Sequence, residues 1–114
     1  MLSVAAPDPP ALAITAETDG GTTVLHLAGE LDLATADLLR ERVRELLGRD
    51  TVLEELVLDL AGLEFLDVTG VGALLETRRK LAATGARLTL RRPRPMVVRM
   101  LTLLHLDDAL QTED

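Results

Sequence analysis

The chain has 114 residues, no cysteine, a formal net charge of −7 and one aromatic residue, Phe65. This length supports one domain with a substantial core, and the missing thiols exclude disulfides and Cys-based zinc sites. The acidic balance argues against nucleic acid as the main partner, and the shortage of aromatic residues excludes base-stacking platforms. Because no apolar run reaches the roughly 20 residues of a membrane helix and no signal peptide is evident, we expect a cytoplasmic protein without membrane insertion.

The first half of the chain predicts a hairpin followed by a helix. Residues 1–10 are rich in proline and are expected to be a disordered lead-in to a single domain at residues 11–114. Strand-like patterns cover Ala11–Glu17 and Thr22–Ala28, and the Asp-Gly-Gly sequence between them is typical of a turn. A helix with a regular apolar stripe is expected from about Ala34 to Leu47.

The central stretch predicts a buried strand, a polar elbow and an amphipathic helix. Residues 56–60 are an apolar run broken only by Asp59, as in a strand buried on both faces. Ala61–Gly62 is predicted to open a turn, and residues 63–66 return to apolar character before the sequence Asp-Val-Thr-Gly. Asp67 and Thr69 are residue types that accept hydrogen bonds from the first turn of a helix.

The last part of the chain predicts one more strand and one more helix. Ala86–Arg91 has strand character, and the basic stretch Arg91–Arg94 is interpreted as a solvated loop. A helix should start at Pro95, because proline is tolerated in the first helical turn, and end near Leu104. We expect it to bury Val98, Leu101 and either Leu104 or Val97. Residues 106–110 are assigned a short edge strand, and residues 111–114 a polar tail.

The resulting order of strand, strand, helix, strand, helix, strand, helix indicates an α/β fold. Strand–helix–strand crossovers make the later strands parallel, with helices packed against the sheet.

Two separate motifs resemble the STAS domain family. Residues 29–32 (Gly-Glu-Leu-Asp) before an Ala/Thr-rich helix look like the GELD segment of that family. Residues 58–72, from Leu-Asp-Leu through Asp-Val-Thr-Gly-Val-Gly, are similar to its central strand and elbow. Residues 85–88 and the Pro95 helix match its later elements, so the resemblance covers nearly all of residues 11–110. It implies a STAS-like mixed sheet of four to five strands with about three helices packed on it.

Within the family, the chain is most similar to stand-alone bacterial anti-sigma factor antagonists. This resemblance implies binding to an anti-sigma factor that is also a serine kinase, release of a sigma factor, and regulation of transcription. Phosphorylation at the elbow would switch binding off. The partner-binding residues implied by the two motifs are Glu30, Asp32, Asp67, Val68, Thr69, Gly70, Val71 and Gly72.

The chain departs from the family pattern at the phosphate acceptor. In the family the phosphate goes on the hydroxyl residue directly after the elbow aspartate, and here that residue is Val68. Thr69 is the only hydroxyl residue between Gly62 and Gly72, so it is the candidate phosphorylation site. Two alternatives stay open: Thr69 is phosphorylated, or it only caps the helix. In the second case the chain would be an unphosphorylated STAS scaffold or a transport-accessory subunit.

Other classes of function find little support in the sequence. The Gly70-x-Gly72 pair lacks the rest of a dinucleotide-binding fingerprint, and His26 and His105 lack metal-ligand spacing. No histidine lies near the elbow to act as a general base. We therefore expect a protein-binding module without enzymatic activity, cofactor or metal, in which weak self-association is an additional possibility.

Overall fold

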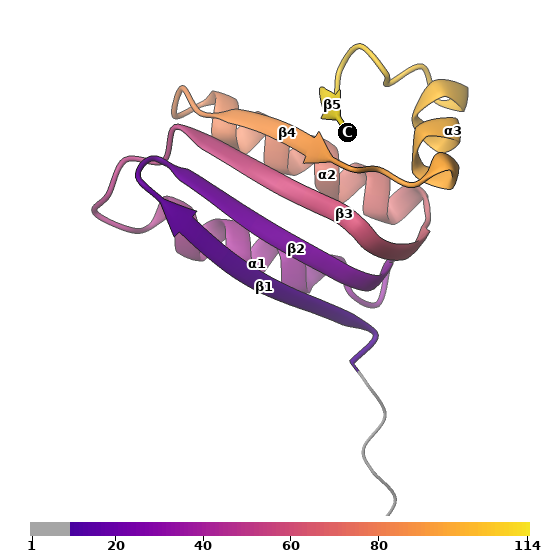
Figure 1. Cartoon of the computed structure of the whole chain (residues 1–114), viewed down its shortest axis with the longest axis horizontal. Coiled ribbons are helices and arrows are strands. Elements are labelled where there is room, and N and C mark those ends of the chain that lie inside the picture. Colours follow the sequence, from indigo (N-terminus) through magenta and orange to yellow (C-terminus); the bar gives the residue numbers. More distant parts are fainter. Residues whose placement is uncertain (1–9) are drawn as a thin grey trace, which may run out of the picture.

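The computed structural model describes residues 10–114, so the lead-in predicted for residues 1–10 lies almost wholly outside the described residues. The chain forms a mixed sheet with helices α1 and α2 on one face, while α3 stands near the end of β4 (Figure 1). The elements, in chain order, are β1 (Leu12–Asp19), β2 (Thr22–Leu31), α1 (Ala36–Leu47), β3 (Glu55–Leu66), α2 (Val68–Ala82), β4 (Arg87–Arg91), α3 (Pro95–Leu103) and β5 (Thr112–Glu113).

The strands lie in the order β1-β2-β3-β4-β5. β1 and β2 form the expected antiparallel hairpin, and every later neighbour pair is parallel. The predicted α/β class, with a mixed sheet and three helices, is therefore confirmed. Because the three parallel strands β2, β3 and β4 run side by side, the loops that follow β2 and β3 lie at the same edge of the sheet.

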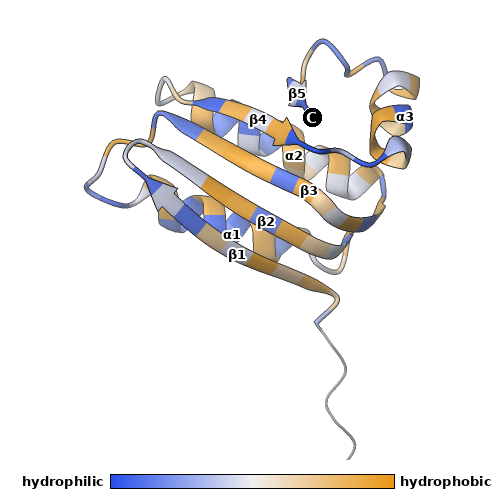
Figure 2. Ribbon diagram, in the orientation of Figure 1, coloured by the Kyte–Doolittle hydropathy of each residue, from blue (hydrophilic) through white to orange (hydrophobic). Residues whose placement is uncertain are grey.

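The core lies between the sheet and the two helices α1 and α2. Register places Leu25, Leu58 and Leu90 side by side on β2, β3 and β4, and all three are buried. Leu39 of α1 and Leu74 of α2 belong to the same buried cluster. Burying one such side chain contributes about 1.5–3 kcal/mol. Figure 2 shows the apolar residues running along β2 and β3, the strands at the centre of this core.

The predicted turn at Ala61–Gly62 is wrong, because β3 continues through these residues as a strand. His26 pairs with Asp59, whereas Ala28 pairs with Gly62, so β3 has one more residue than β2 over this stretch. Such a β-bulge bends a strand without ending it. A Cβ on Gly62 would lie 3.0 Å from the Leu27 carbonyl oxygen, so the glycine permits close strand pairing here.

Two predictions for the C-terminal part are also wrong. Residues 106–110 form turns, and the strand is β5 in the expected polar tail. β5 is held by backbone pairing with Leu90 and Arg91, which does not require an apolar side-chain pattern. In α3, the expected burial of Val98 is wrong, since this residue is 45% exposed. Leu101 is buried as expected, and of the two alternatives Val97 is buried whereas Leu104 is 40% exposed.

The basic loop between β4 and α3 is exposed at Arg92 and Arg94, as predicted, but its arginines also bond to neighbouring strands. The Arg92 guanidinium donates hydrogen bonds to the carboxylate of Asp59, which is only 3% exposed. Arg91 Nε lies 2.8 Å from Glu113 Oε1, and Arg94 Nε donates to the Ala61 carbonyl oxygen at 2.8 Å. The three arginines therefore attach the loop to β3 and β5.

Asp59 is the centre of this cluster on the sheet face opposite α1 and α2. His26 Nδ1 lies 2.9 Å from Asp59 Oδ2, and the Ala61 amide donates to Asp59 Oδ1 at 3.1 Å. Burial raises the pKa of the Asp59 carboxyl, but the hydrogen bonds from Arg92, Ala61 and His26 outweigh burial and hold the pKa below its ordinary value. The one charged residue of the central apolar run is thus a structural ion-pair partner.

Candidate partner-binding site

The elbow between β3 and α2 is fixed by a helix cap. Asp67 is extended, with φ −110°, and its Oδ1 accepts a hydrogen bond from the Gly70 amide at 2.8 Å. The helix begins at Val68, so Thr69 occupies the second helical position and Asp67 alone is the N-cap. Such a cap contributes about 1 kcal/mol. It also gives Val68 and Thr69 defined positions at the start of the helix.

The loop between β2 and α1 is fixed by Asp32 and Thr35. Asp32 Oδ1 accepts hydrogen bonds from the Ala34 amide at 3.0 Å and the Thr35 amide at 3.2 Å. The buried Thr35 hydroxyl donates to the Glu30 carbonyl oxygen at 2.8 Å. The Asp32 carboxylate therefore holds the shape of the loop, and its removal would alter structure as well as charge.

The structure brings these two loops together at the carboxyl edge of the parallel strands. Leu31 pairs with Leu66, and the Asp67 amide donates to the Leu31 carbonyl oxygen at 3.3 Å. A Cβ on Gly70 would lie only 2.3 Å from the same oxygen. The start of α2 is thus pressed against the end of β2, and only glycine fits at position 70.

The eight residues implied by the motifs fall into two groups. Gly70 and Val71 are buried, and Val71 is 2% exposed, so neither presents a side chain to a partner. Both pack within the chain, and their expected role in partner binding stays a prediction. The six residues at the surface, exposed or half-buried, are Glu30, Asp32, Asp67, Val68, Thr69 and Gly72.

Two exposed apolar residues extend this surface. Leu33 is 78% exposed in the β2–α1 loop, and Phe65 is 46% exposed beside Glu30, its partner in the strand register. Sequence reasoning did not select either as a site residue. The available indications were that Phe65 is the only aromatic residue and that Leu33 is apolar directly after the Gly-Glu-Leu-Asp motif. We call the combined set the elbow surface: Glu30, Asp32, Leu33, Phe65, Asp67, Val68, Thr69 and Gly72.

Gly72 differs from Gly70 in having open space around it. A Cβ built on Gly72 would meet no atom within 4 Å. Glycine inside a helix costs about 1 kcal/mol relative to alanine. Because packing within the chain does not require glycine at position 72, the missing side chain leaves room for the close approach of another molecule, one turn along the helix from Val68.

The elbow surface is acidic. Residues 29–37 and 62–72 contain five carboxylates and neither lysine nor arginine. Nearby Arg40 is engaged with Asp37 at 2.9 Å and with Glu76 at 2.8 Å. The hydrogen bond from Arg40 lowers the pKa of Glu76. Of the five carboxylates, Asp37 is paired with Arg40, and neither segment supplies a cationic side chain to the other four.

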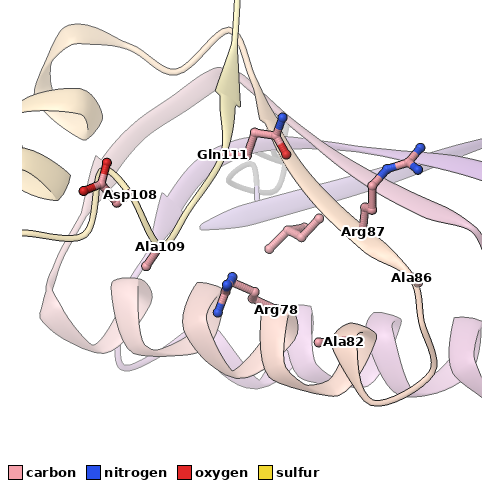
Figure 3. A pocket seen from close by; sticks show the side chains of 8 residues that line it. Arg78, Ala82, Ala86, Arg87, Asp108, Ala109 and Gln111 are labelled. Atoms are coloured by element: carbon pink, nitrogen blue, oxygen red, sulfur yellow. The ribbon is translucent and has the colours of Figure 1, made fainter.

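Within residues 10–114, no cluster of three His, Asp or Glu side chains is placed to hold a metal ion, and no helix is long and apolar enough to cross a membrane. A hollow of about 260 Å³ lies beside the C-terminal half of α2, away from the elbow (Figure 3). There the guanidinium groups of Arg78 and Arg87 point in different directions rather than toward a common point (Figure 3).

A mixed sheet with two helices on one face, and with two motif-bearing loops joined at one edge, defines the STAS class of domain. The sequence profile of the STAS domain matches residues 13–114, and the chain belongs to this family.

Relatives of the chain include anti-sigma factor antagonists. An anti-sigma F factor antagonist from Paenibacillus polymyxa is 32% identical over 92 residues, which are 81% of this chain and 78% of the relative. The crystal structure of an anti-sigma factor antagonist from Mycobacterium paratuberculosis has a TM-score of 0.77 at 26% identity, covering 96% of this chain and 90% of that one. The phosphorylated form of the Bacillus cell fate determinant SpoIIAA has a TM-score of 0.69 at 26% identity, covering 88% and 90% of the two chains.

Proposed function

We propose that this protein is an anti-sigma factor antagonist that binds a cognate anti-sigma factor through the elbow surface. Occupying the anti-sigma factor would free a sigma factor and so regulate transcription. The observation that carries this proposal is that the two family motifs meet at one edge of the sheet. There the Asp67 amide donates a hydrogen bond to the Leu31 carbonyl oxygen, and Val68 is 70% exposed. Relatives named anti-sigma factor antagonists, matched over most of the chain, support the same assignment.

The function proposed here is binding rather than catalysis. Asp32 and Asp67, the two motif carboxylates, accept backbone hydrogen bonds that shape their loops. The His26 side chain is hydrogen-bonded to Asp59 in the middle of the sheet. It therefore lies away from the elbow, which β2 and β3 reach only at their ends, Leu31 and Leu66. The elbow therefore supplies a shaped and charged surface without a general base beside a nucleophile.

Phosphorylation by a serine-kinase partner is limited to one position on the elbow surface. Val68 stands at the family's acceptor position with its side chain in solvent, but it has no hydroxyl. Thr69, half-buried at the second position of α2, is the only hydroxyl residue of that surface. We infer that modification, if the partner is a kinase, is confined to Thr69, where a phosphate would add nearly two negative charges to an acidic face.

A second candidate function follows from Val68 itself. A surface that no kinase can modify at the family position suits a permanent binding module, such as a STAS scaffold or a transport-accessory subunit. The two functions differ in whether a sigma factor is released.

The deciding experiment uses purified sigma–anti-sigma complexes from the source genome. Each complex is mixed with this protein and resolved by size-exclusion chromatography. Our proposal expects free sigma factor and a new complex of this protein with one anti-sigma factor. If every sigma–anti-sigma complex stays intact at excess antagonist and no anti-sigma factor binds in calorimetry, the assignment is wrong and the scaffold function is favoured.

A further inference from the structure

We propose that the partner's docking face carries an apolar pocket bordered by arginine or lysine side chains, an inference that rests on the proposed function. Its basis is the chemistry of the elbow surface, in which exposed apolar side chains share two loops with carboxylates.

The apolar centre consists of Leu33 and Val68. They are 78% and 70% exposed, and they follow the paired strand ends Leu31 and Leu66 by two residues each. Hydrogen bonds fix both loops, to Asp32 in one and to Asp67 in the other. Preorganised apolar side chains lose little conformational entropy on binding, and such anchors carry most of the energy of an interface when they fill a pocket.

Carboxylates lie in the same two loops and at the strand ends that lead into them. Glu30 and Glu64 are exposed, and one oxygen of each of Asp32 and Asp67 remains free of the loop hydrogen bonds. A hollow of about 550 Å³ on the open face of the sheet adjoins the surface, with a floor that includes Ala28 and Gly62.

Glu30 and Glu64 both line this hollow, which has room for a long basic side chain between two carboxylates. Arg94 also lines it, but its Nε is held by the Ala61 carbonyl oxygen. Its guanidinium keeps its positive charge, so Glu30, Glu64 and Arg94 together leave a net charge of −1 in the hollow. A cationic border on the partner would meet this remaining negative charge, which mainly raises the association rate and selects against acidic competitors.

The first test measures binding of the anti-sigma factor found in the sigma-release experiment. By calorimetry, Leu33→Ala should weaken binding roughly 10-fold, and Val68→Asp roughly 30-fold or more, because a carboxylate would enter an apolar pocket. Val52→Asp is the matched control: Val52 is 80% exposed and precedes β3 at the opposite end of the sheet. The control should bind within about twofold of wild type. Thermal midpoints of all three variants should equal that of wild type.

The second test measures association rates between about 50 and 500 mM salt, a range over which the screening length falls several-fold. Replacing both Glu30 and Glu64 by glutamine should slow association several-fold at low salt and flatten the salt dependence. Glu45 is exposed in the half of α1 away from the elbow, and the control variant Glu45→Gln should leave the association rate and its salt dependence unchanged. Association rates of the double variant that match wild type at every salt concentration would overturn the basic border.

Failure of this inference is distinguishable from failure of the proposed function. If an anti-sigma factor binds wild type but Leu33→Ala and Val68→Asp retain full affinity, the function stands and the apolar pocket is refuted. If no anti-sigma factor binds wild type, both are refuted.

Discussion

Gly70 and Gly72 are separated by a single residue in α2. Alanine at the two positions should nevertheless change the free energy of unfolding in opposite directions. At Gly70 the new Cβ would be 2.3 Å from the Leu31 carbonyl oxygen and 2.7 Å from Leu66 Cδ1. Because the nearer atom belongs to the backbone of β2, relief requires a shift of the helix, and such overpacking costs about 1–3 kcal/mol. The gain in helix propensity of about 1 kcal/mol offsets only part of this cost.

At Gly72 only the favourable term remains, because the new Cβ meets no atom within 4 Å. Gly72→Ala should therefore stabilise the fold by about 0.5–1 kcal/mol, and Gly70→Ala should destabilise it by up to about 2 kcal/mol. Urea unfolding followed by far-UV circular dichroism is the suitable assay, since the chain has neither tryptophan nor tyrosine. Equal unfolding midpoints for the two variants would refute the close approach of α2 to β2.

The same pair of variants also tests the elbow surface. If a partner approaches the helix over Gly72, then Gly72→Ala should bind the anti-sigma factor more weakly than wild type despite its higher stability. Binding at wild-type strength would mean that the space over Gly72 is not part of the interface.

Three further predictions concern the core, the buried ion pair and the acceptor position. Leu58→Ala should destabilise by about 2–5 kcal/mol through a cavity, and an unchanged urea midpoint would contradict a central place for β3. Asp59→Asn should cost about 2 kcal/mol at pH 7 through the charged hydrogen bonds with Arg92. The pKa of Asp59 in the folded protein lies below its ordinary value, so the stability advantage of wild type over Asp59→Asn should be complete above about pH 5 and shrink as the pH falls through the folded pKa. A stability difference between the two proteins that does not change between about pH 7 and pH 2.5 would contradict this prediction. With a kinase-type anti-sigma factor and ATP, intact-mass and peptide mapping should find no phosphate or phosphate on Thr69 alone, and Val68→Ser should add a site at position 68; phosphate elsewhere would remove the elbow from regulation.

The fold was largely predictable because its main elements carry strong local patterns. The apolar run at residues 56–60 and the Asp-Val-Thr-Gly elbow correctly predicted a buried strand leading into a helix. Where the prediction was wrong, backbone pairing decided the outcome. Gly62 sits in a bulge rather than a turn, and Thr112–Glu113 becomes a strand by pairing with β4, although its side chains are exposed.

The site was predictable only in part, because exposure depends on packing between distant segments. In sequence, Gly70 and Gly72 are equivalent members of one motif. Only the position of the Leu31 carbonyl shows that one is required for packing and the other is not. Leu33 could equally have been a core residue, since nothing in its own segment indicates that the turn held by Asp32 directs it outward.

The bulges of β3 have a consequence for how this fold can vary in length. β3 uses 12 residues to run beside the 10 residues of β2, from the pair Thr22–Glu55 to the pair Leu31–Leu66. The register shifts where β3 gains these residues lie on the elbow side of the His26–Asp59 pair, past the aligned leucines of β2, β3 and β4. A residue could be lost or gained there while Leu25, Leu58 and Leu90 stay aligned. Changes in the length of this one stretch would then turn the elbow relative to the sheet, and only the part of the core around Leu27, Leu60 and Leu63 would have to repack.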